Sequence, residues 1–211
     1  VARNLIQNGS VDRIAMVGVV GNLMLWALGH DIGEGNRDFI RRSLGEAFEE
    51  TWQDSEKLVS EYQSLLFLPS DLAVEEDGTR KTIGLDDLPT NFPIYDIGID
   101  TMMRLRPLIM EANCLLWNGP ASYFEKSEFA YGTVEIMNMF TEATGVTIVG
   151  GGHTSALFNQ RGKADQVSHN STGGGSVLTM LSGGKMPVFE SLETSENKFR
   201  PLLRSLGISK V

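Results

Sequence analysis

Cysteine is almost absent from this chain of 211 residues. Cys114 is its only cysteine, so no disulfide can form within the chain. This scarcity is typical of proteins from a reducing compartment, and we expect a cytoplasmic protein. Long hydrophobic runs are missing as well. Residues 14–29 carry no charge but number only 16, whereas a membrane span needs about 20. We also find no basic region followed by a hydrophobic one at the N-terminus, and therefore expect no signal peptide and no contact with a membrane.

Positive charge is also scarce. The chain has 18 Lys and Arg against 27 Asp and Glu, which gives a formal net charge of −9. Proteins that bind nucleic acid usually present a basic face, and no basic cluster is visible here, so we exclude a nucleic-acid partner. A phosphate-bearing ligand would have to be bound by backbone N–H groups and helix N-termini.

Short apolar runs alternate with stretches of helical periodicity, which favours an α/β fold with a Rossmann-like parallel sheet and helices on both of its faces. Gly29 is placed to end the first of these helices, and Asp100 to cap a later one. We expect strands at residues 13–17, 65–68, 94–97, 114–117, 146–149 and 167–169. We expect helices at residues 22–28, 38–62 (broken in the middle), 100–111, 133–144, 154–159 and 176–181.

The remaining segments complete the expected organisation. The polar stretch 75–89 reads as an exposed loop or hairpin. Cys114 lies in an apolar strand and is expected to be a small buried hydrophobe. We predict one nucleotide-binding domain over residues 1–190, followed by a polar tail over residues 191–211 that forms a helix or strap docked on another surface.

The 23 glycines are the richest source of functional information, because they cluster at expected strand ends. Glycine-bearing turns occur at residues 18–21, 118–120, 150–152 and 173–175. In open parallel sheets, ligands bind outside the carboxyl ends of the strands. Without Cβ atoms, these turns can approach a phosphate closely and aim successive N–H groups at it. We therefore expect an adenine nucleotide at this edge.

Competing motifs are weaker. Residues 183–186 read Gly-Gly-Lys-Met and do not complete a Walker A loop. Residues 17–21 with Asp38 resemble a dinucleotide fingerprint, but the final glycine is missing and Asp38 opens a charged helical stretch. No G-x-S-x-G elbow of a hydrolase occurs. The three histidines are not spaced as zinc ligands, and we predict no metal site made by protein side chains.

The wording and order of four segments resemble the C-terminal, nucleotide-binding half of phosphoglycerate kinase, in a form closer to archaeal members. They are Leu-Trp-Asn-Gly-Pro at 116–120, Phe-Glu at 124–125, Thr-Ile-Val-Gly-Gly-Gly at 147–152 and Val-Ser-His-Asn-Ser-Thr-Gly-Gly-Gly at 167–175. The resemblance runs from about residue 1 to about residue 190. It implies one half of a two-domain kinase.

The resemblance also implies roles for individual residues. Gly18 would line the adenine side with Tyr95 as an apolar wall, and Glu125 would accept hydrogen bonds from the ribose hydroxyls. Three glycines at a helix N-terminus would stabilise the transferring phosphoryl group, which makes them the catalytic candidates: Gly173, Gly174 and Gly175. The residues beside the phosphates would be Asn118, Pro120, Gly151, Gly152, His153 and Thr154.

The implied ligand is ATP or ADP with Mg²⁺ carried by the nucleotide, and the implied reaction of the whole protein is phosphate transfer between 1,3-bisphosphoglycerate and ADP in glycolysis and gluconeogenesis. Two residues depart from the family pattern, since His153 replaces an aspartate that meets the nucleotide-bound magnesium and Ser122 replaces a glycine. The phosphoglycerate-binding half and a lysine-bearing strand of the family are not in this chain. We therefore expect an N-terminal half as partner and an isolated chain without activity. The alternative is a non-catalytic adenylate-binding or scaffold domain with the same fold.

Overall fold

A computed structural model describes residues 1–205, with side chains described through residue 202. Two of its three sheets are parallel. In the first, β1 (Ile14–Ala15) pairs with β2 (Leu66–Phe67), and in the second the strand order is β6 (Cys114–Asn118), β7 (Val146–Gly150), β8 (His169–Ser171). Each of these strands lies within or beside a segment that was predicted to be a strand.

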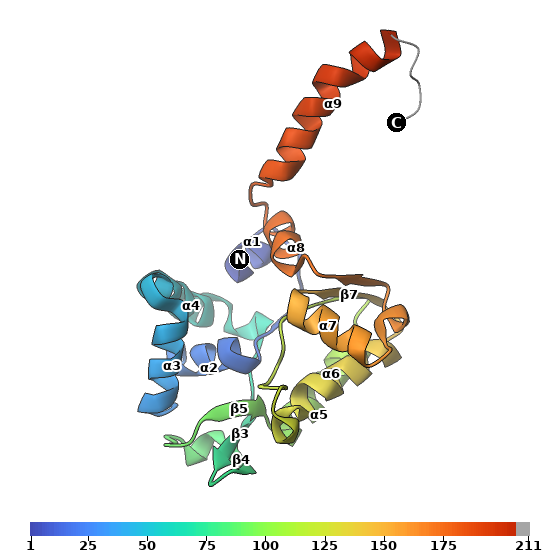
Figure 1. Cartoon of the computed structure of the whole chain (residues 1–211). Helices are drawn as coiled ribbons and strands as arrows, with labels where there is room; N and C mark the ends of the chain where they lie inside the picture. Colours follow the sequence, from blue (N-terminus) through green and yellow to red (C-terminus); the bar gives the residue numbers. More distant parts are fainter. Residues whose placement is uncertain (206–211) are drawn as a thin grey trace.

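Helices follow the parallel strands along the chain, as the sequence predicted. Figure 1 shows α6 and α7 on one side of the strands and α8 on the other. The α/β class with parallel sheets and flanking helices is thus confirmed. The helices of this half are α5 (Ile99–Met110), α6 (Tyr131–Glu142), α7 (Gly152–Gln160) and α8 (Gly174–Leu181).

The N-terminal helices are α1 (Ala2–Gln7), α2 (Gly18–Ala27), α3 (Glu34–Leu44) and α4 (Phe48–Tyr62). Gly29 ends α2 as predicted: its φ is +105°, and its N–H donates to the Trp26 carbonyl at 2.9 Å. The predicted break in the long helix lies at Gly45, where φ is +53°. A side chain rarely adopts this conformation, so the glycine lets α3 and α4 turn away from each other.

Residues 94–97 form a strand as predicted, but our placement of that strand in the parallel sheet was wrong. β5 (Ile94–Ile97) pairs antiparallel with β3 (Asp71–Glu76), which also pairs antiparallel with β4 (Thr79–Gly84). The reason is the tight turn between β3 and β4, where Asp77 and Gly78 both have positive φ. Such a turn makes a hairpin, and the hairpin presents the other edge of β3 to β5.

A buried carboxylate shows why the predicted N-cap of α5 was also wrong. Asp100 does not cap the helix; the carboxylate of Asp71, from β3, accepts the backbone N–H of Asp100 at 3.0 Å and of Thr101 at 2.7 Å. A Cβ on Gly98 would overlap this carboxylate. A tertiary contact thus satisfies the helix end that a local side chain was expected to satisfy.

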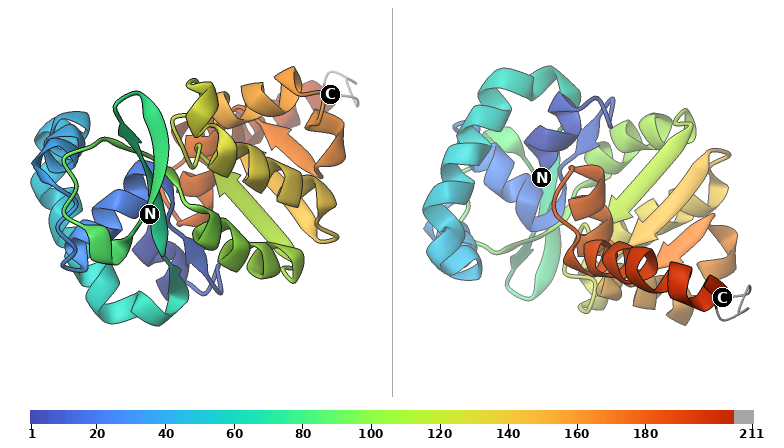
Figure 2. Two further views of the ribbon diagram at one scale, coloured as in Figure 1. Left: turned by 90° about the horizontal axis from the view of Figure 1, so that it is seen from below. Right: turned by 90° about the horizontal axis from the view of Figure 1, so that it is seen from above.

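The buried side chains form two clusters, one on each side of the molecule. The first surrounds β6 and β7 and includes Trp117, Phe140, Val149 and Phe158. The second lies among α2, α3, α4 and β3 and includes Leu25, Ile32, Ile40 and Leu72. Figure 2 shows the same division into two groups of elements.

The strand edges between these two groups are unpaired within residues 1–205. β1 has only β2 beside it, and β6 has only β7. The apolar strand β6 is accordingly buried only in part, and its first residue, Cys114, is exposed. Our prediction that Cys114 is buried was therefore wrong, because we assumed neighbours on both sides of its strand.

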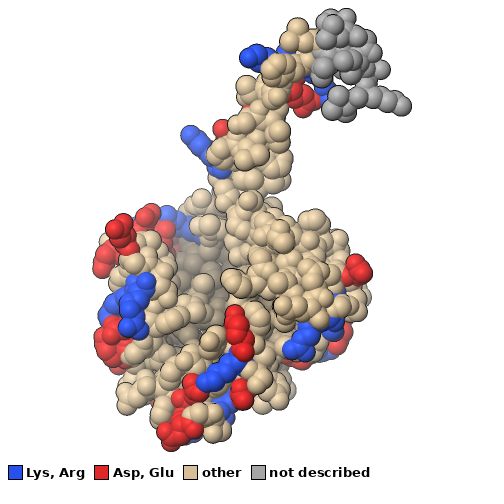
Figure 3. Space-filling model, viewed as in Figure 1, with Lys and Arg blue, Asp and Glu red and all other residues tan. Residues whose placement is uncertain are grey.

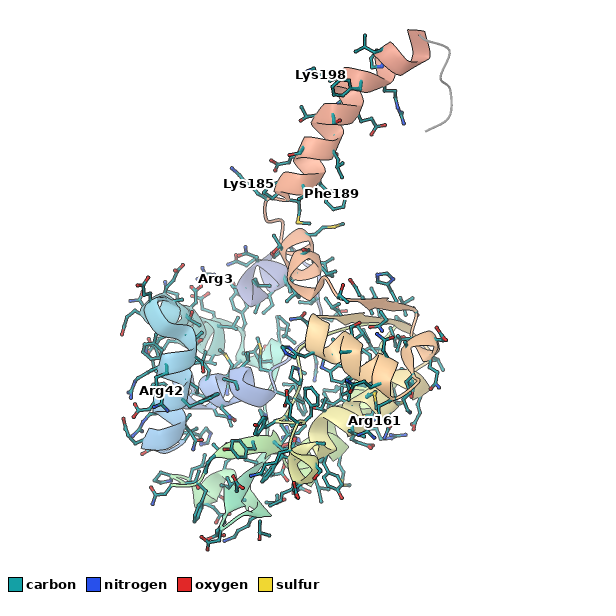
Figure 4. All side chains as sticks on the ribbon, viewed as in Figure 1. Arg3, Arg42, Arg161, Lys185, Phe189 and Lys198 are labelled. Carbon is teal, nitrogen blue, oxygen red and sulfur yellow. The ribbon has the colours of Figure 1, made fainter. Side chains whose placement is uncertain are left out.

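The last described element is α9 (Pro187–Ser205), which extends away from the body of the molecule (Figures 1 and 4). The tail, expected as a helix or strap over residues 191–211, is helical through Ser205, and its expected start falls inside α9. Its docking on another surface stays a prediction. Its exposed apolar side chains include Val188, Phe189 and Leu192. The last part of the tail, residues 206–211, lies outside the described residues. Among those that are described, no helix is long and apolar enough to cross a membrane.

Candidate functional site

The carboxyl ends of β1 and β6 lead into segments that touch each other. Gly18, the first residue of α2, has φ +61°, and a Cβ at this position would lie 3.0 Å from the carbonyl oxygen of Pro120 and 3.3 Å from that of Ala121. Only glycine fits this contact without strain. The structure therefore brings together two of the predicted glycine segments that are about 100 residues apart in the sequence. The prediction of a separate turn at residues 18–21 was wrong, because these residues form the first turn of α2.

The other two turns meet at Asn118, the last residue of β6. A Cβ on Gly174 would overlap both the Oδ1 atom of Asn118 and the backbone nitrogen of Gly151. Gly151 itself has φ +98°, and a Cβ there would lie 3.3 Å from Asn118 Oδ1. Four predicted positions (Asn118, Gly150, Gly151 and Gly174) thus form one backbone surface at the carboxyl edge of the sheet.

Two helices begin at this surface. α7 starts directly after Gly151 and α8 directly after Gly173, and neither has a side-chain cap or an acidic residue in its first turn. The N–H groups in the first turn of a helix have no partner within the helix, and the helix dipole adds a partial positive charge. These ends can therefore bind an anion, since neither helix carries an acidic residue in its first turn to occupy them.

Buried polar atoms without partners lie at the same edge. The hydroxyl of Thr154, in the first turn of α7, has no hydrogen-bond partner within the described residues although the residue is 1% exposed. The Oδ1 atom of Asn170, in β8, is also buried and has no partner there. Because buried polar groups are rarely left unsatisfied, these two atoms mark where a further hydrogen-bond partner is needed. Our sequence analysis missed Asn170, although it lies in the quoted segment before the triple glycine.

The predicted apolar wall, Tyr95, stands beside a second aromatic residue. The Tyr123 N–H donates to the Tyr95 carbonyl at 2.7 Å, and the two rings have centroids 5.2 Å apart in an edge-on arrangement. Tyr95 makes the same kind of contact with the buried ring of Phe129. Tyr123 is 48% exposed. It was not among the predicted residues, because nothing local in the sequence indicates that its segment lies against β5.

Glu125 lies in the segment between β6 and α6. Its side chain is exposed, and it makes no hydrogen bond or ion pair within the described residues. The segment itself is fixed at its start: the Ala121 N–H donates to Thr133 Oγ1 at 3.1 Å, and the hydroxyl of Ser122 lies 2.6 Å from the same oxygen. Ser122, which stands where the family resemblance implies a glycine, therefore ties the segment to α6.

The remaining predicted residues are open to solvent. A Cβ on Gly152 or on Gly175 would meet nothing within 4 Å. His153 is exposed in the first turn of α7. The Gly173 N–H donates to Ser171 Oγ at 3.1 Å, which shapes the turn before α8. The structure therefore gives these residues room for a ligand but no contact with one another.

Few charges surround this region. Figure 3 shows a recess between the side with α2–α4 and the side with α7 and α8, and Lys, Arg, Asp and Glu appear mainly on its outer rim. No group of three or more His, Cys, Asp and Glu among residues 1–205 could hold a metal ion. The arrangement suits a ligand bound by backbone N–H groups more than one bound by charged side chains or a protein-held metal.

Comparison with known proteins finds relatives of this chain in one family. The family model described as phosphoglycerate kinase matches residues 1–184. The phosphoglycerate kinase of Methanobacterium bryantii is 36% identical over 200 residues, which are 95% of this chain and 48% of that protein. The phosphoglycerate kinase of Pyrococcus abyssi is 34% identical over 204 residues, covering 95% of this chain and 49% of that protein.

Solved structures agree with the sequence relatives. The crystal structure of phosphoglycerate kinase from Pyrococcus horikoshii OT3 matches with a TM-score of 0.84 and 30% identity, over 93% of this chain and 49% of that one. The phosphoglycerate kinase of Coxiella burnetii matches with a TM-score of 0.70 and 29% identity, over 86% of this chain and 47% of that one. The chain spans about half the length of the relatives that it matches.

Proposed function

This chain belongs to the phosphoglycerate kinase family, and from that premise we propose that it is the C-terminal, nucleotide-binding half of such an enzyme. The whole protein would transfer a phosphoryl group between 1,3-bisphosphoglycerate and ADP. This chain would bind the adenine nucleotide, and the other half would bind the phosphoglycerate. Relatives of about twice the length support this division.

One observation carries the proposal: two helix N-termini without side-chain caps and a buried hydroxyl lie beside glycines at which an added Cβ would collide with neighbouring atoms. The first turns of α7 and α8 supply N–H donors, and Thr154 supplies the hydroxyl. Gly151 and Gly174 leave the backbone bare where they meet Asn118. Such a surface binds phosphate oxygens and stabilises the charge that develops on a transferring phosphoryl group.

The sugar and the base would be bound away from this surface. The carboxylate of Glu125 has no partner within the described residues and can accept hydrogen bonds from ribose hydroxyls. Tyr95 and the glycine contact at Gly18 would line the base, which needs an apolar wall and close approach more than charge.

Magnesium fits this site only when it arrives with the nucleotide. Mg²⁺ prefers carboxylate, phosphate and water oxygens, and no carboxylate lies in the first turn of α7 or α8. The nucleotide's own phosphates would therefore coordinate the ion. The residues of this chain would position the phosphates and direct hydrogen-bond donors at their oxygens.

A second candidate is a non-catalytic adenylate-binding domain with the same fold. His153 favours it, because an exposed imidazole stands at the α7 N-terminus, where the family resemblance implies a carboxylate. An imidazole donates to phosphate but is a poor ligand for Mg²⁺. Both candidate functions involve binding of an adenine nucleotide, but only the kinase half should bind it in a way that depends on Mg²⁺.

Calorimetric titration with ADP, with and without Mg²⁺, tests the proposal. We expect saturable binding of one ADP per chain, with phosphate-free adenosine binding much more weakly. Equal affinity for adenosine and ADP would contradict a phosphate-binding role for the glycine edge. Binding that ignores Mg²⁺ entirely would favour the non-catalytic candidate.

A further inference from the structure

The segment 119–130 is anchored by hydrogen bonds at its start and by the buried ring of Phe129 near its end, with Glu125 exposed between them. Ala121 and Ser122 are tied to Thr133, and the Tyr123 N–H donates to the Tyr95 carbonyl. Glu125 follows two residues later, and its side chain makes no hydrogen bond or ion pair within the described residues. Phe124 before it packs against the core around β6 and β7. The direction of the Glu125 carboxylate then depends on what fixes Lys126, the residue after it.

That next residue, Lys126, reaches out of the segment to the other sheet. Its ammonium donates to the carboxylate of Glu75 on β3. It also lies 5.7 Å from the ring centroids of both Tyr95 and Phe129. The hydrogen bond to Glu75 raises the pKa of Lys126 above its ordinary value. One cation thus joins a carboxylate and two aromatic faces.

The backbone of Glu75, the partner of Lys126, is held in place by the sheet around it. β3 is the middle strand of its sheet, and the Glu75 N–H donates to the Pro93 carbonyl at 3.0 Å. Arg80 lies opposite Glu75 on β4 but extends its guanidinium to Asp96 instead. The side chain of Glu75 is 19% exposed and the side chain of Lys126 is 37% exposed, so this pair is less open to solvent than an ordinary surface pair.

We propose that Lys126 and Glu75 form a positioning pair that fixes Glu125 and Tyr123 toward the sugar and base of a bound nucleotide. The proposal rests on the proposed nucleotide-binding function. The pair acts in two ways. It ties the second half of the segment 119–130 to β3, and it engages the ammonium that would otherwise be free to pair with the neighbouring carboxylate of Glu125.

The chain provides a matched control. Lys81 on β4 pairs with Glu76 on β3 at 2.7 Å, one residue along the strand from Glu75. This second pair belongs to the same hairpin, but neither partner contacts the segment 119–130 in any described interaction. Lys81→Met therefore removes a lysine–glutamate pair from the sheet without touching the proposed nucleotide site.

The experiment compares ADP with inorganic pyrophosphate, which has neither sugar nor base. We expect Lys126→Met and Glu75→Gln each to raise the Kd for ADP by about 3- to 10-fold, and the double variant to match the single variants. The Kd for pyrophosphate should stay at the parental value in all of them. Lys126→Arg should keep most of the ADP affinity, and Lys81→Met should bind ADP like the parent.

Several results would overturn the positioning role. They are parental ADP affinity in both single variants, additive losses in the double variant, or an equal loss of pyrophosphate binding, which would indicate general damage to the fold. Failure of the proposed function has a different signature, because the unaltered chain would then bind neither ADP nor pyrophosphate.

Discussion

Arg80 donates from Nη2 to the fully buried carboxylate of Asp96 at 3.3 Å, and this pair joins β4 to β5. Asp96 also accepts the N–H groups of Gly132 at the start of α6, at 3.0 Å, and of its neighbour Ile97, at 2.8 Å. A Cβ on Gly132 would overlap this carboxylate. The contact therefore fixes the antiparallel sheet against the helix that follows the segment with Glu125.

The buried carboxylate of Asp96 should make the free energy of unfolding depend on pH. Burial raises the pKa of Asp96 from 3.8 to about 6, against the opposing effects of the N–H donors and Arg80. Because the folded state holds this proton more tightly than the unfolded state, the contribution to the free energy of unfolding is fully present below about pH 4 and is lost as the pH rises through 6. A shift of about two pKa units corresponds to about 3 kcal/mol.

Urea unfolding of the parent and of Asp96→Asn at pH 4, 5, 6 and 7 measures this effect. The difference between the two proteins removes the titration of all other groups. We expect the parent to lose stability relative to Asp96→Asn between pH 4 and pH 7. A difference that stays constant across this range would show that Asp96 titrates alike in both states.

Gly174 is the most sensitive position of the glycine edge. A methyl group there collides with Asn118 and Gly151, so we expect Gly174→Ala to lower the free energy of unfolding by about 1–3 kcal/mol and to weaken ADP binding by at least about tenfold. Gly35→Ala, in α3 with open space around it, should leave ADP binding unchanged and stabilise the helix by about 0.5–1 kcal/mol. Parental ADP affinity in a folded Gly174→Ala would exclude this edge from the phosphate site.

Glu125→Ala should weaken ADP by about 1.5–3 kcal/mol, the usual range for a hydrogen bond to a charged group. The melting temperature should barely change, since the side chain is exposed. Calorimetry and a thermal melt of the same sample check both statements. An unaltered Kd, or a large fall in the melting temperature, would contradict the assignment of Glu125 to the ribose.

His153 should contribute to ADP binding by donating its imidazole N–H to a phosphate oxygen, since an imidazole is a poor ligand for Mg²⁺. In His153→Asp, ADP binding without Mg²⁺ should weaken while the dependence on Mg²⁺ grows. Calorimetric titration of both proteins with ADP, with and without Mg²⁺, checks this. Identical responses to Mg²⁺ in the two proteins would leave His153 without a role in binding.

The isolated chain should show no measurable kinase turnover. Reaction needs both substrates within about 3–3.5 Å, and the sequence shows no cluster of arginines that could hold a phosphoglycerate. A coupled assay of the chain alone, and of the chain mixed with the proposed N-terminal half, tests this expectation. Turnover near that of a full-length relative without the added half would contradict it.

The sequence predicted those parts of the fold that local chemistry determines. Apolar runs that end in glycine placed β6 and β7 within a residue of their observed ends, and Gly29 ended α2 as expected. Glycine turns also predicted which loops would share an edge, because parallel strands bring their carboxyl ends together.

Long-range contacts account for what the sequence did not predict. The N–H groups at the start of α5 are satisfied by Asp71, about 30 residues earlier, so Asp100 was a misleading local signal. The antiparallel direction of β5 depends on the hairpin that precedes it. The contacts of Tyr123 with β5 and of Lys126 with β3 could not be predicted, because they form only when the folded chain brings these strands beside their segment.

Within residues 1–205, one edge of β1 and one edge of β6 have no partner strand, which has a consequence for how this chain behaves in solution. A free edge presents a row of N–H and C=O groups that can pair with a strand of another molecule, and proteins usually block such edges with lysine, proline or a bulge. β6 reads Cys-Leu-Leu-Trp-Asn and has none of these. Refolding yield should therefore fall as the protein concentration rises, through edge-to-edge association that begins at β6.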